Sequence, residues 1–435
     1  MRHLLVLTFL LLCGLERPGQ AQLGPLDRGR ARDMLAVLHN DVRKYYYDPG
    51  FRGIDLDREF QHADSMLDRA QSIPQLFGVI AKVLLQFQDS HTIFLPPSQT
   101  TQVRYGWELR MVGDSCFVTG ITPASDAAAK SLRIGDRVIT IQGVPPTRQL
   151  LNVLDYLLYR LSPADVIQFR VESPDGQVRD LAVASKVLPD QQLIDLTVST
   201  DVWAIIRGID DQVEMGRNRF VEVDSATLVW HLPGFDSNDG IDEGIGRARR
   251  HANLVLDLRG NRGGGSRVLL RMLGRLLERE TVVDTLRLRD KVEVETVRPD
   301  ERRFAGKLIV LVDSRSASAA ELLARVVQLE NRGMVIGDRS AGAVMMSRVH
   351  VHRVGTQIIV PYAASITEAD VIMRDGSRLE GIGVSPDVLV VASGQDLSVG
   401  RDPVFGEALR RLGYPVGPGG VTSPFPALAL EMENW

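Results

Sequence analysis

The sequence has few cysteines, few aromatic residues and no excess of either charge. Only two cysteines, Cys13 and Cys116, occur in 435 residues, and 6% of the residues are aromatic. Two thiols, one of them inside an apolar N-terminal segment, exclude a disulfide framework and a cysteine-based metal site. The 51 Lys+Arg nearly balance the 55 Asp+Glu, for a net charge of −4. This balance argues against nucleic acid or a polybasic membrane surface as the partner.

Long hydrophobic runs are also missing, except at the N-terminus. Basic residues at 2–3 precede an apolar run at 4–15, and the small residues Gly19 and Ala21 follow at the spacing of a signal-peptide cleavage site. The run is too short to span a bilayer, which takes ~20 residues. We therefore expect residues 1–21 to be a cleaved export signal. The mature protein would be periplasmic or secreted, with no transmembrane anchor.

The rest of the chain has the length of about three domains, at ~150 residues per domain. Residues 22–100 are predicted to be helical, because apolar residues recur at helical spacing over 33–47, 60–70 and 74–87. The connector after the third of these helices carries the motif Asp89-Ser90-His91-Thr92. A lone loop histidine such as this one is usually structural or solvated.

Residues 101–187 change to short strands joined by turns. The pattern predicts strands at 116–121 and 134–141, helices at 124–132 and 150–161, and a hairpin that pairs 166–171 with 178–183. This order resembles a PDZ domain, a fold that often binds peptide ends by strand addition. The run from Leu132 to Gly143 carries the most specific part of that resemblance.

Residues 188–392 alternate between buried strands and helices. The pattern predicts strands at 254–258, 308–312 and 334–336, with helices at 267–277, capped by Ser266, and at 318–329. Such alternation predicts an α/β core of parallel strands, with ligand and catalytic groups at the carboxyl ends of the strands. The tail, residues 393–435, contains one predicted helix near 403–412. The fold class is therefore multidomain α/β.

Two turns at predicted strand ends carry residues suited to chemistry. Ser318 lies between a strand and a helix, where a sharp turn can expose its Oγ at the positive helix end. Because Ser318-x-x-Glu321 also spells a capping box, the segment alone leaves a nucleophile and a cap open. Residues 260–265 form a glycine-rich turn whose N–H groups could approach an oxyanion or a phosphate. The turn lacks the Gly-Lys-Ser/Thr of a Walker A loop, and a simple tight turn stays an alternative.

Four motifs and the PDZ-like segment occur together in a definite order. The motifs are Asp89-Ser90-His91-Thr92, Asp257-Leu258-Arg259-Gly260-Asn261-x-Gly263-Gly264, Ser316-Ala317-Ser318-Ala319-Ala320-Glu321 and Glu380-Gly381-Ile382-Gly383-Val384-Ser385-Pro386-Asp387. In this order they resemble the tail-specific, or C-terminal processing, serine protease family, including its tricorn-protease-like branch. The resemblance covers roughly residues 30–412. It implies a catalytic core of the α/β type shared by ClpP and crotonase.

That family has two catalytic designs, and the sequence distinguishes between them. One design pairs the serine with a lysine about 25 residues later, but that position is Ala343 here and no lysine follows Lys307. The tricorn-like design instead uses a histidine preceded by a serine, together with a glutamate. The residues that match its roles by resemblance are the nucleophile Ser318, the general base His91, and Ser90 and Glu380, which complete the tetrad.

The resemblance also implies two binding features. The backbone N–H groups of Gly263 or Gly264 and of Ala319 would form an oxyanion hole, and such a donor is typically worth ~10²–10³ in rate. In the PDZ-like segment, the residues that would hold a peptide's carboxyl end are Arg104, Gly106, Trp107 and Leu109. Glu108 lies within this loop and would repel a carboxylate, and Arg104 could compensate for it.

The sequence therefore predicts an exported serine endopeptidase that cleaves unfolded or C-terminal segments of proteins, without cofactor or metal ion. Its partners would be polypeptide substrates, and the sequence leaves open whether the protein forms a homo-oligomer. A second hypothesis is a catalytically silent peptide- or lipid-binding protein, because the interphotoreceptor retinoid-binding proteins resemble this core and act as carriers. Retention of serine, histidine and glutamate together favours the enzyme. A crotonase-type acyl-CoA enzyme is a third hypothesis, and the export signal argues against it.

Overall fold

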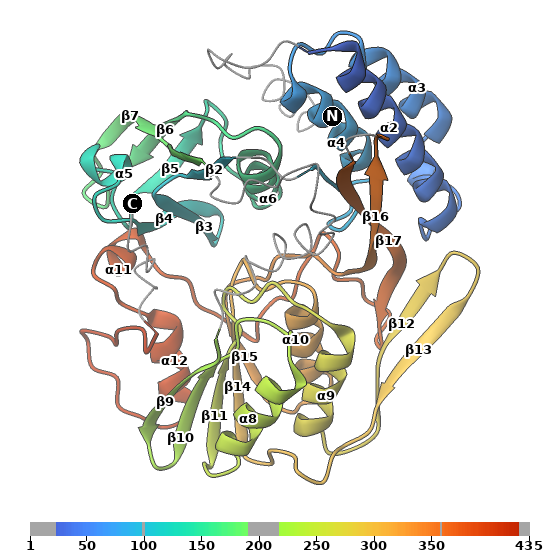
Figure 1. Ribbon diagram of the computed structural model, residues 1–435. Helices are drawn as coiled ribbons and strands as arrows, with labels where there is room; N and C mark the ends of the chain where they lie inside the picture. The colour runs from blue at the N-terminus through green and yellow to red at the C-terminus, as the bar shows by residue number, and fades with distance from the viewer. Residues whose placement is uncertain (1–22, 98–100, 190–216, 357–358, 426–435) are drawn as a thin grey trace.

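The computed structural model describes residues 23–97, 101–189, 217–356 and 359–425. The predicted export signal, residues 1–21, lies outside these ranges. Figure 1 shows a helical region and a β domain side by side above an α/β core. No helix in the described ranges combines the length and the apolar composition that a membrane crossing requires.

Three helices form the N-terminal region, as the apolar spacing predicts. They are α2 (Pro25–Tyr45), α3 (Leu56–Leu67) and α4 (Ile73–Leu85). Asp55 and Ser72 begin α3 and α4 by accepting hydrogen bonds from the amides of Arg58 and Gln75. The apolar faces of the helices share a core with β17 (Val360–Met373), which fixes the helical region to the rest of the protein.

The β domain, described residues 101–189, contains the predicted strands and hairpin. Its larger sheet is antiparallel with the order β3-β4-β5-β6-β7, so β3 is an edge strand, and β2 pairs with β8. The helix predicted at 124–132 is shorter than expected, because Ala124 and Ser131 adopt positive φ and bracket it. The elements are β2 (Thr101–Arg104), β3 (Trp107–Val112), β4 (Ser115–Ile121), α5 (Asp126–Ala129), β5 (Arg137–Ile141), α6 (Arg148–Tyr156), η2 (Leu157–Leu161), β6 (Val166–Glu172), β7 (Val178–Ala184) and β8 (Lys186–Pro189).

The core contains the predicted parallel sheet. Its strand order is β18-β15-β14-β11-β10-β9, parallel throughout except for β9. Helices α8, α9 and α10 cover one face and α12 covers the other (Figure 1). The elements are β9 (Arg219–Asp224), β10 (Thr227–His231), α8 (Asn238–Ala248), β11 (Asn253–Asp257), α9 (Ser266–Leu276), β14 (Lys307–Val312), α10 (Ala319–Leu329), β15 (Met334–Gly337), β18 (Val388–Leu389), α11 (Gly394–Ser398) and α12 (Pro403–Arg411).

One cap in this core differs from the prediction. Ser266 is the first residue of α9, and Gly265 occupies the N-cap position with an extended backbone. The Gly265 amide donates to the carbonyl of Phe235, which lies in the segment after β10. This hydrogen bond holds the end of the glycine turn, so Gly265 and not Ser266 is the N-cap residue.

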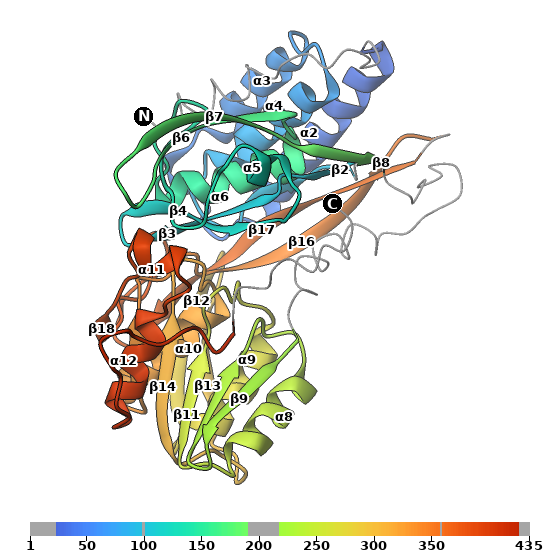
Figure 2. The same cartoon turned by 90° about the vertical axis from the view of Figure 1, so that its left-hand side faces the viewer.

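A second sheet was not predicted from the strand–helix alternation. It contains β12 (Thr281–Leu288), β13 (Val292–Val297), β16 (Met345–Val354), β17 and the short β1 (Ile93–Leu95). The long antiparallel pair β16–β17 lies between the helical region and the core (Figures 1 and 2). Because β1 pairs with β17, the segment that follows Asp89-Ser90-His91-Thr92 is fixed to the second sheet.

Candidate active site

Ser318 lies at the carboxyl edge of the core sheet, on the turn between β14 and α10. Its backbone has φ +54° and ψ −119°, a conformation that a residue with a side chain adopts only under constraint. The capping box with Glu321 is present, yet a serine that only caps a helix has an extended backbone. Capping therefore does not account for the geometry, whereas a strained strand-to-helix turn is what exposes a nucleophile above a sheet.

The glycine turn after β11 packs directly against Ser318. A Cβ atom on Gly263 would lie 2.6 Å from the Cβ of Ser318, and one on Gly264 would lie 2.5 Å from the Phe235 carbonyl oxygen. Both glycines have positive φ, +101° and +140°. Close approach and positive φ together require glycine at these positions, and the approach brings backbone amides next to the serine.

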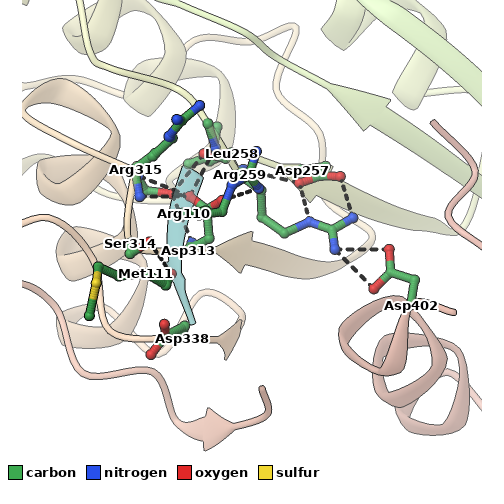
Figure 3. Close-up of polar contacts among 12 residues, drawn as sticks. Arg110, Met111, Asp257, Leu258, Arg259, Asp313, Ser314, Arg315, Asp338 and Asp402 are labelled. Atoms are coloured by element: carbon green, nitrogen blue, oxygen red, sulfur yellow. Dashed lines mark hydrogen bonds and ion pairs between the residues drawn. The ribbon is translucent and has the colours of Figure 1, made fainter. Parts of the chain in front are cut away.

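Polar contacts hold the two turns in place. The Ala317 amide donates to the Asn261 carbonyl at 2.9 Å, which joins the serine turn to the glycine turn. Arg259 bridges Asp257, at the end of β11, and Asp402, at the start of α12, with N–O distances of 2.8–2.9 Å (Figure 3). All three of these charged groups are largely buried. The ion pairs therefore hold Arg259, the residue that precedes the glycine turn, in a fixed position.

Ser90, His91 and Glu380 form a continuous hydrogen-bond relay. Ser90 Oγ lies 2.6 Å from His91 Nδ1 and donates to Glu380 Oε2 at 2.9 Å. The Ser90 amide donates to the other carboxylate oxygen of Glu380 at 2.7 Å. These residues are 290 positions apart in the sequence, and the tertiary structure brings them together.

Asp89 is the first residue of the motif Asp89-Ser90-His91-Thr92, in which the sequence assigned it no role of its own, and it organises the turn that carries His91. Its Oδ1 accepts from the amides of His91 and Thr92 at 3.0 and 2.7 Å, and from Thr367 Oγ1 of β17 at 2.8 Å. Its Oδ2 accepts from Tyr46 Oη at 2.9 Å. Asp89 thus fixes the turn that carries His91 to both the helical region and β17. An aspartate directly before the Ser-His pair, in a turn after a helix, was the available sequence signal.

Ala343 and Val344 connect the serine turn to the relay. The Ser318 amide donates to the Ala343 carbonyl at 2.9 Å, and the Val344 amide donates to Glu380 Oε2 at 2.7 Å. Ala343 occupies the position where the other design places its lysine. The backbone of this segment therefore links Ser318 with Glu380. Its side chain at position 343 has no amine that could act as a base.

Glu321, which the sequence suggested only as a capping residue, holds this connecting segment against the serine. Its carboxylate accepts from the Ser318 amide at 3.1 Å, from Ser340 Oγ at 2.6 Å, and from the amides of Gly342 and Ala343 at 2.8 and 2.9 Å. Burial raises the pKa of Glu321 to about 7, against the opposing effect of these hydrogen bonds.

Burial also sets the electrostatics of the relay. It lowers the pKa of His91 below the ordinary 6.5, although the nearby Asp89 carboxylate acts in the opposite direction. It raises the pKa of Glu380, against the hydrogen bonds from Val344 and Ser90. A neutral imidazole at neutral pH is what a general base needs. Among the described residues, no cluster of three or more His, Cys, Asp or Glu side chains could hold a metal ion.

The residues expected to hold a peptide end lie on β2, on β3 and in the turn between these strands. The side chains of Trp107 and Leu109 are buried in the core of the β domain. Gly106 has φ +72°, and its carbonyl accepts from the Thr122 amide at 2.9 Å. Arg104 ends β2, opposite Lys186 of β8. Capture of a peptide end by these residues stays a prediction.

Comparisons with known proteins show which family the core is similar to. Residues 227–390 match the model of Peptidase family S41. The chain is 26% identical over 368 residues to the chloroplastic C-terminal processing peptidase of Tetradesmus obliquus, covering 80% of this chain and 74% of that protein. It is 25% identical over 389 residues to tricorn protease homolog 2 of Streptomyces coelicolor, covering 85% of this chain but only 31% of that longer protein.

Solved structures show the same fold at low sequence identity. Mature CPAF complexed with lactacystin has a TM-score of 0.64 at 15% identity, covering 89% of this chain and 98% of that chain. The photosystem II D1 C-terminal processing protease has a TM-score of 0.51 at 20% identity, covering 83% and 93%. The family match and the C-terminal processing relatives define the class of this protein. It is a serine-type peptidase with a multidomain α/β fold.

Proposed function

We propose that this protein is an endopeptidase that cleaves unfolded or C-terminal segments of proteins, with Ser318 as nucleophile and His91 as general base. The observation that carries the proposal is the relay His91–Ser90–Glu380 joined through Val344 and Ala343 to a strained Ser318. The substrate class is taken from the relatives, which are named as C-terminal processing peptidases.

The hydrogen bonds of Ser90 support one tautomer of His91. Ser90 Oγ has a single proton and donates it to Glu380 Oε2, so it must accept from His91 Nδ1–H. The lone pair then lies on Nε2, and this nitrogen is the one available to the Ser318 hydroxyl. Glu380 would stabilise the imidazolium that forms, as the acidic member does in other triads.

The reaction would follow the acyl-enzyme route. Ser318 Oγ attacks the substrate carbonyl carbon while its proton passes to His91 Nε2. The carbon–nitrogen bond then breaks, and His91 returns the proton to the leaving amine. Water, deprotonated by His91, releases the acyl group and restores the serine.

The oxyanion donors can be inferred from which backbone amides already donate a hydrogen bond within the protein. The Gly263 amide donates to Asn261 Oδ1 at 2.8 Å. In the described ranges the amides of Gly264 and Ala319 donate no hydrogen bond. The sequence left open whether Gly263 or Gly264 acts together with Ala319. We therefore propose the amides of Gly264 and Ala319 as the oxyanion donors.

A fluorophosphonate probe and a denatured-protein digest test the proposal. The wild-type protein should be labelled at Ser318 and should fragment a mixture of denatured proteins, as read by mass spectrometry. Ser318→Ala should do neither while keeping its thermal unfolding profile. A folded wild-type protein that is not labelled would instead favour the silent carrier hypothesis.

The pH dependence should report the base. His91 must be neutral to accept a proton, and burial lowers its pKa below 6.5, so kcat/KM should fall on the acid side only below about pH 6.5. Burial raises the pKa of Glu321 to about 7, so NMR titration of the His91 ring in Ser318→Ala is used to distinguish the two groups. An acid limb centred near pH 9 would indicate an amine base and contradict the assignment.

Export is the remaining part of the proposal. The small residues Gly19 and Ala21 predict cleavage before Gln22. N-terminal sequencing of protein collected outside the cytoplasm should begin at Gln22. Recovery of the uncleaved chain, or of a lipid-modified Cys13, would contradict this expectation.

A further inference from the structure

The edge strand β3 of the β domain contacts the turn that leads to Ser318. Arg110 Nη1 donates to Asp313 Oδ2 at 2.7 Å. The backbone of β3 takes part as well, because the Met111 carbonyl accepts from Ser314 Oγ (Figure 3). The Leu109 carbonyl accepts from Arg315 Nη2 at 2.6 Å. Three consecutive residues of β3 thus bind three consecutive residues of the serine turn.

These contacts occupy the free edge of the β domain. Among the described strands, β3 pairs only with β4, so alternate carbonyls along β3 face away from the sheet. Leu109 and Met111 supply two such carbonyls, and both already accept hydrogen bonds from side chains of the α/β core. A substrate strand added along β3 would have to displace Ser314 and Arg315.

Asp313 connects this contact to both turns of the site. Its Oδ1 accepts from the amides of Arg315 and Ser316 at 3.0 and 3.1 Å, and from the Gly260 amide of the glycine turn at 2.9 Å. The Asp313 side chain is 10% exposed, and Arg110, 30% exposed, supplies its countercharge. Burial acts to raise the pKa of Asp313, but Arg110 and the amides outweigh it and hold the pKa below its ordinary value.

We propose that Arg110 is a positioning residue for the peptidase, which through Asp313 holds the serine turn and the glycine turn in their mutual arrangement. The β domain then serves as a fixed support for Ser318 through β3. This assignment replaces the expected capture of a peptide end at Leu109, because the Leu109 carbonyl already accepts from Arg315. The inference rests on the proposed function. Removing Arg110 would leave a buried carboxylate unpaired, which is costly, and displacement of a catalytic group by about 1 Å can cost ~10²-fold in rate.

The test measures kcat, KM and the rate of fluorophosphonate labelling for Arg110→Gln and Arg110→Lys, with a short quenched peptide as substrate. We expect Arg110→Gln to lower kcat and the labelling rate about tenfold or more, with KM nearly unchanged. Arg110→Lys keeps the charge and should retain most of the activity. Arg179→Gln is the matched control, because Arg179 pairs with Asp136 inside the β domain. It should lower the thermal stability and leave kcat unchanged.

A second variant distinguishes positioning from general damage. Adding Asp313→Asn to Arg110→Gln removes the unpaired buried charge, so the double variant should recover part of the lost kcat. Hydrogen exchange gives a readout that needs no activity. The amides of 258–264 and 313–318 should exchange faster in Arg110→Gln and not in Arg179→Gln.

Three results would overturn the inference. They are unchanged exchange in both turns, a wild-type kcat in Arg110→Gln, and improved cleavage of long unfolded chains by that variant, which would mark β3 as a substrate edge. Absence of labelling in the folded wild-type protein would contradict the proposed function alone, since the exchange result would still decide the role of Arg110.

Discussion

Replacement of His91 by alanine is expected to lower kcat/KM nearly as far as replacement of Ser318, by about 10⁴-fold or more, because members of a proton-transfer unit are strongly non-additive. The relay supports this expectation, since Ser90 Oγ lies 2.6 Å from His91 Nδ1, and the proposed tautomer leaves Nε2 to accept the Ser318 proton. The measurement is steady-state cleavage of a quenched peptide by each variant and by the double variant. The double variant should be no less active than either single one.

Two further substitutions sharpen this result. Glu380→Gln should cost less, about 10²-fold or less, because it changes orientation and charge and leaves base and nucleophile in place. Ala343→Lys should not rescue His91→Ala, because the Ala343 backbone is held by Glu321 and Ser318. If His91→Ala keeps near-normal turnover while Ser318→Ala is inactive, the tetrad assignment is wrong.

Gly263→Ala is expected to reduce kcat by about 10²–10³-fold with a smaller change in KM. The added Cβ would lie 2.6 Å from the Ser318 Cβ and 3.1 Å from the Ala319 amide nitrogen. These neighbours belong to the proposed nucleophile and to a proposed oxyanion donor. Rotation of the Ser318 side chain cannot relieve the first contact, because it does not move the Cβ atom. Kinetics and fluorophosphonate labelling should fall together.

Gly260 provides the matched control in the same turn. Its φ is +79°, but a Cβ there would meet no atom within 4 Å. Gly260→Ala should therefore cost about 1 kcal/mol of stability through backbone strain and only a small part of kcat. Equal losses of kcat in the two variants would indicate that backbone strain, and not contact with Ser318, explains the effect of Gly263→Ala.

The local sequence pattern was sufficient to predict most of the individual helices and strands. The three N-terminal helices, the hairpin of β6 and β7, and the parallel strands β11, β14 and β15 follow from apolar spacing. Such spacing depends on which face of a helix or strand is buried, so it can be read from neighbouring residues. The shortened α5 and the cap of α9 depend on positive φ and on contacts with Phe235, which periodicity does not register.

The sequence by itself also determined the candidate residues of the site. The order of four motifs singled out Ser318, His91, Ser90 and Glu380, and the absence of any lysine after Lys307 excluded the serine–lysine design. Motifs of this kind identify residue types at fixed local spacing. They say nothing about how segments 290 residues apart meet.

Only the tertiary structure decided how those segments are held. Asp89 bonds Thr367 of β17 across 278 positions, and Asp313 bonds Arg110 of β3 across 203. Such contacts depend on the second sheet and on the docking of the β domain, both of which arise from pairing between distant strands. Pairing of this kind is set by the packing of whole elements and leaves no periodic signal. For the same reason, the occupation of β3's edge by Ser314 and Arg315 could be seen only in the folded chain.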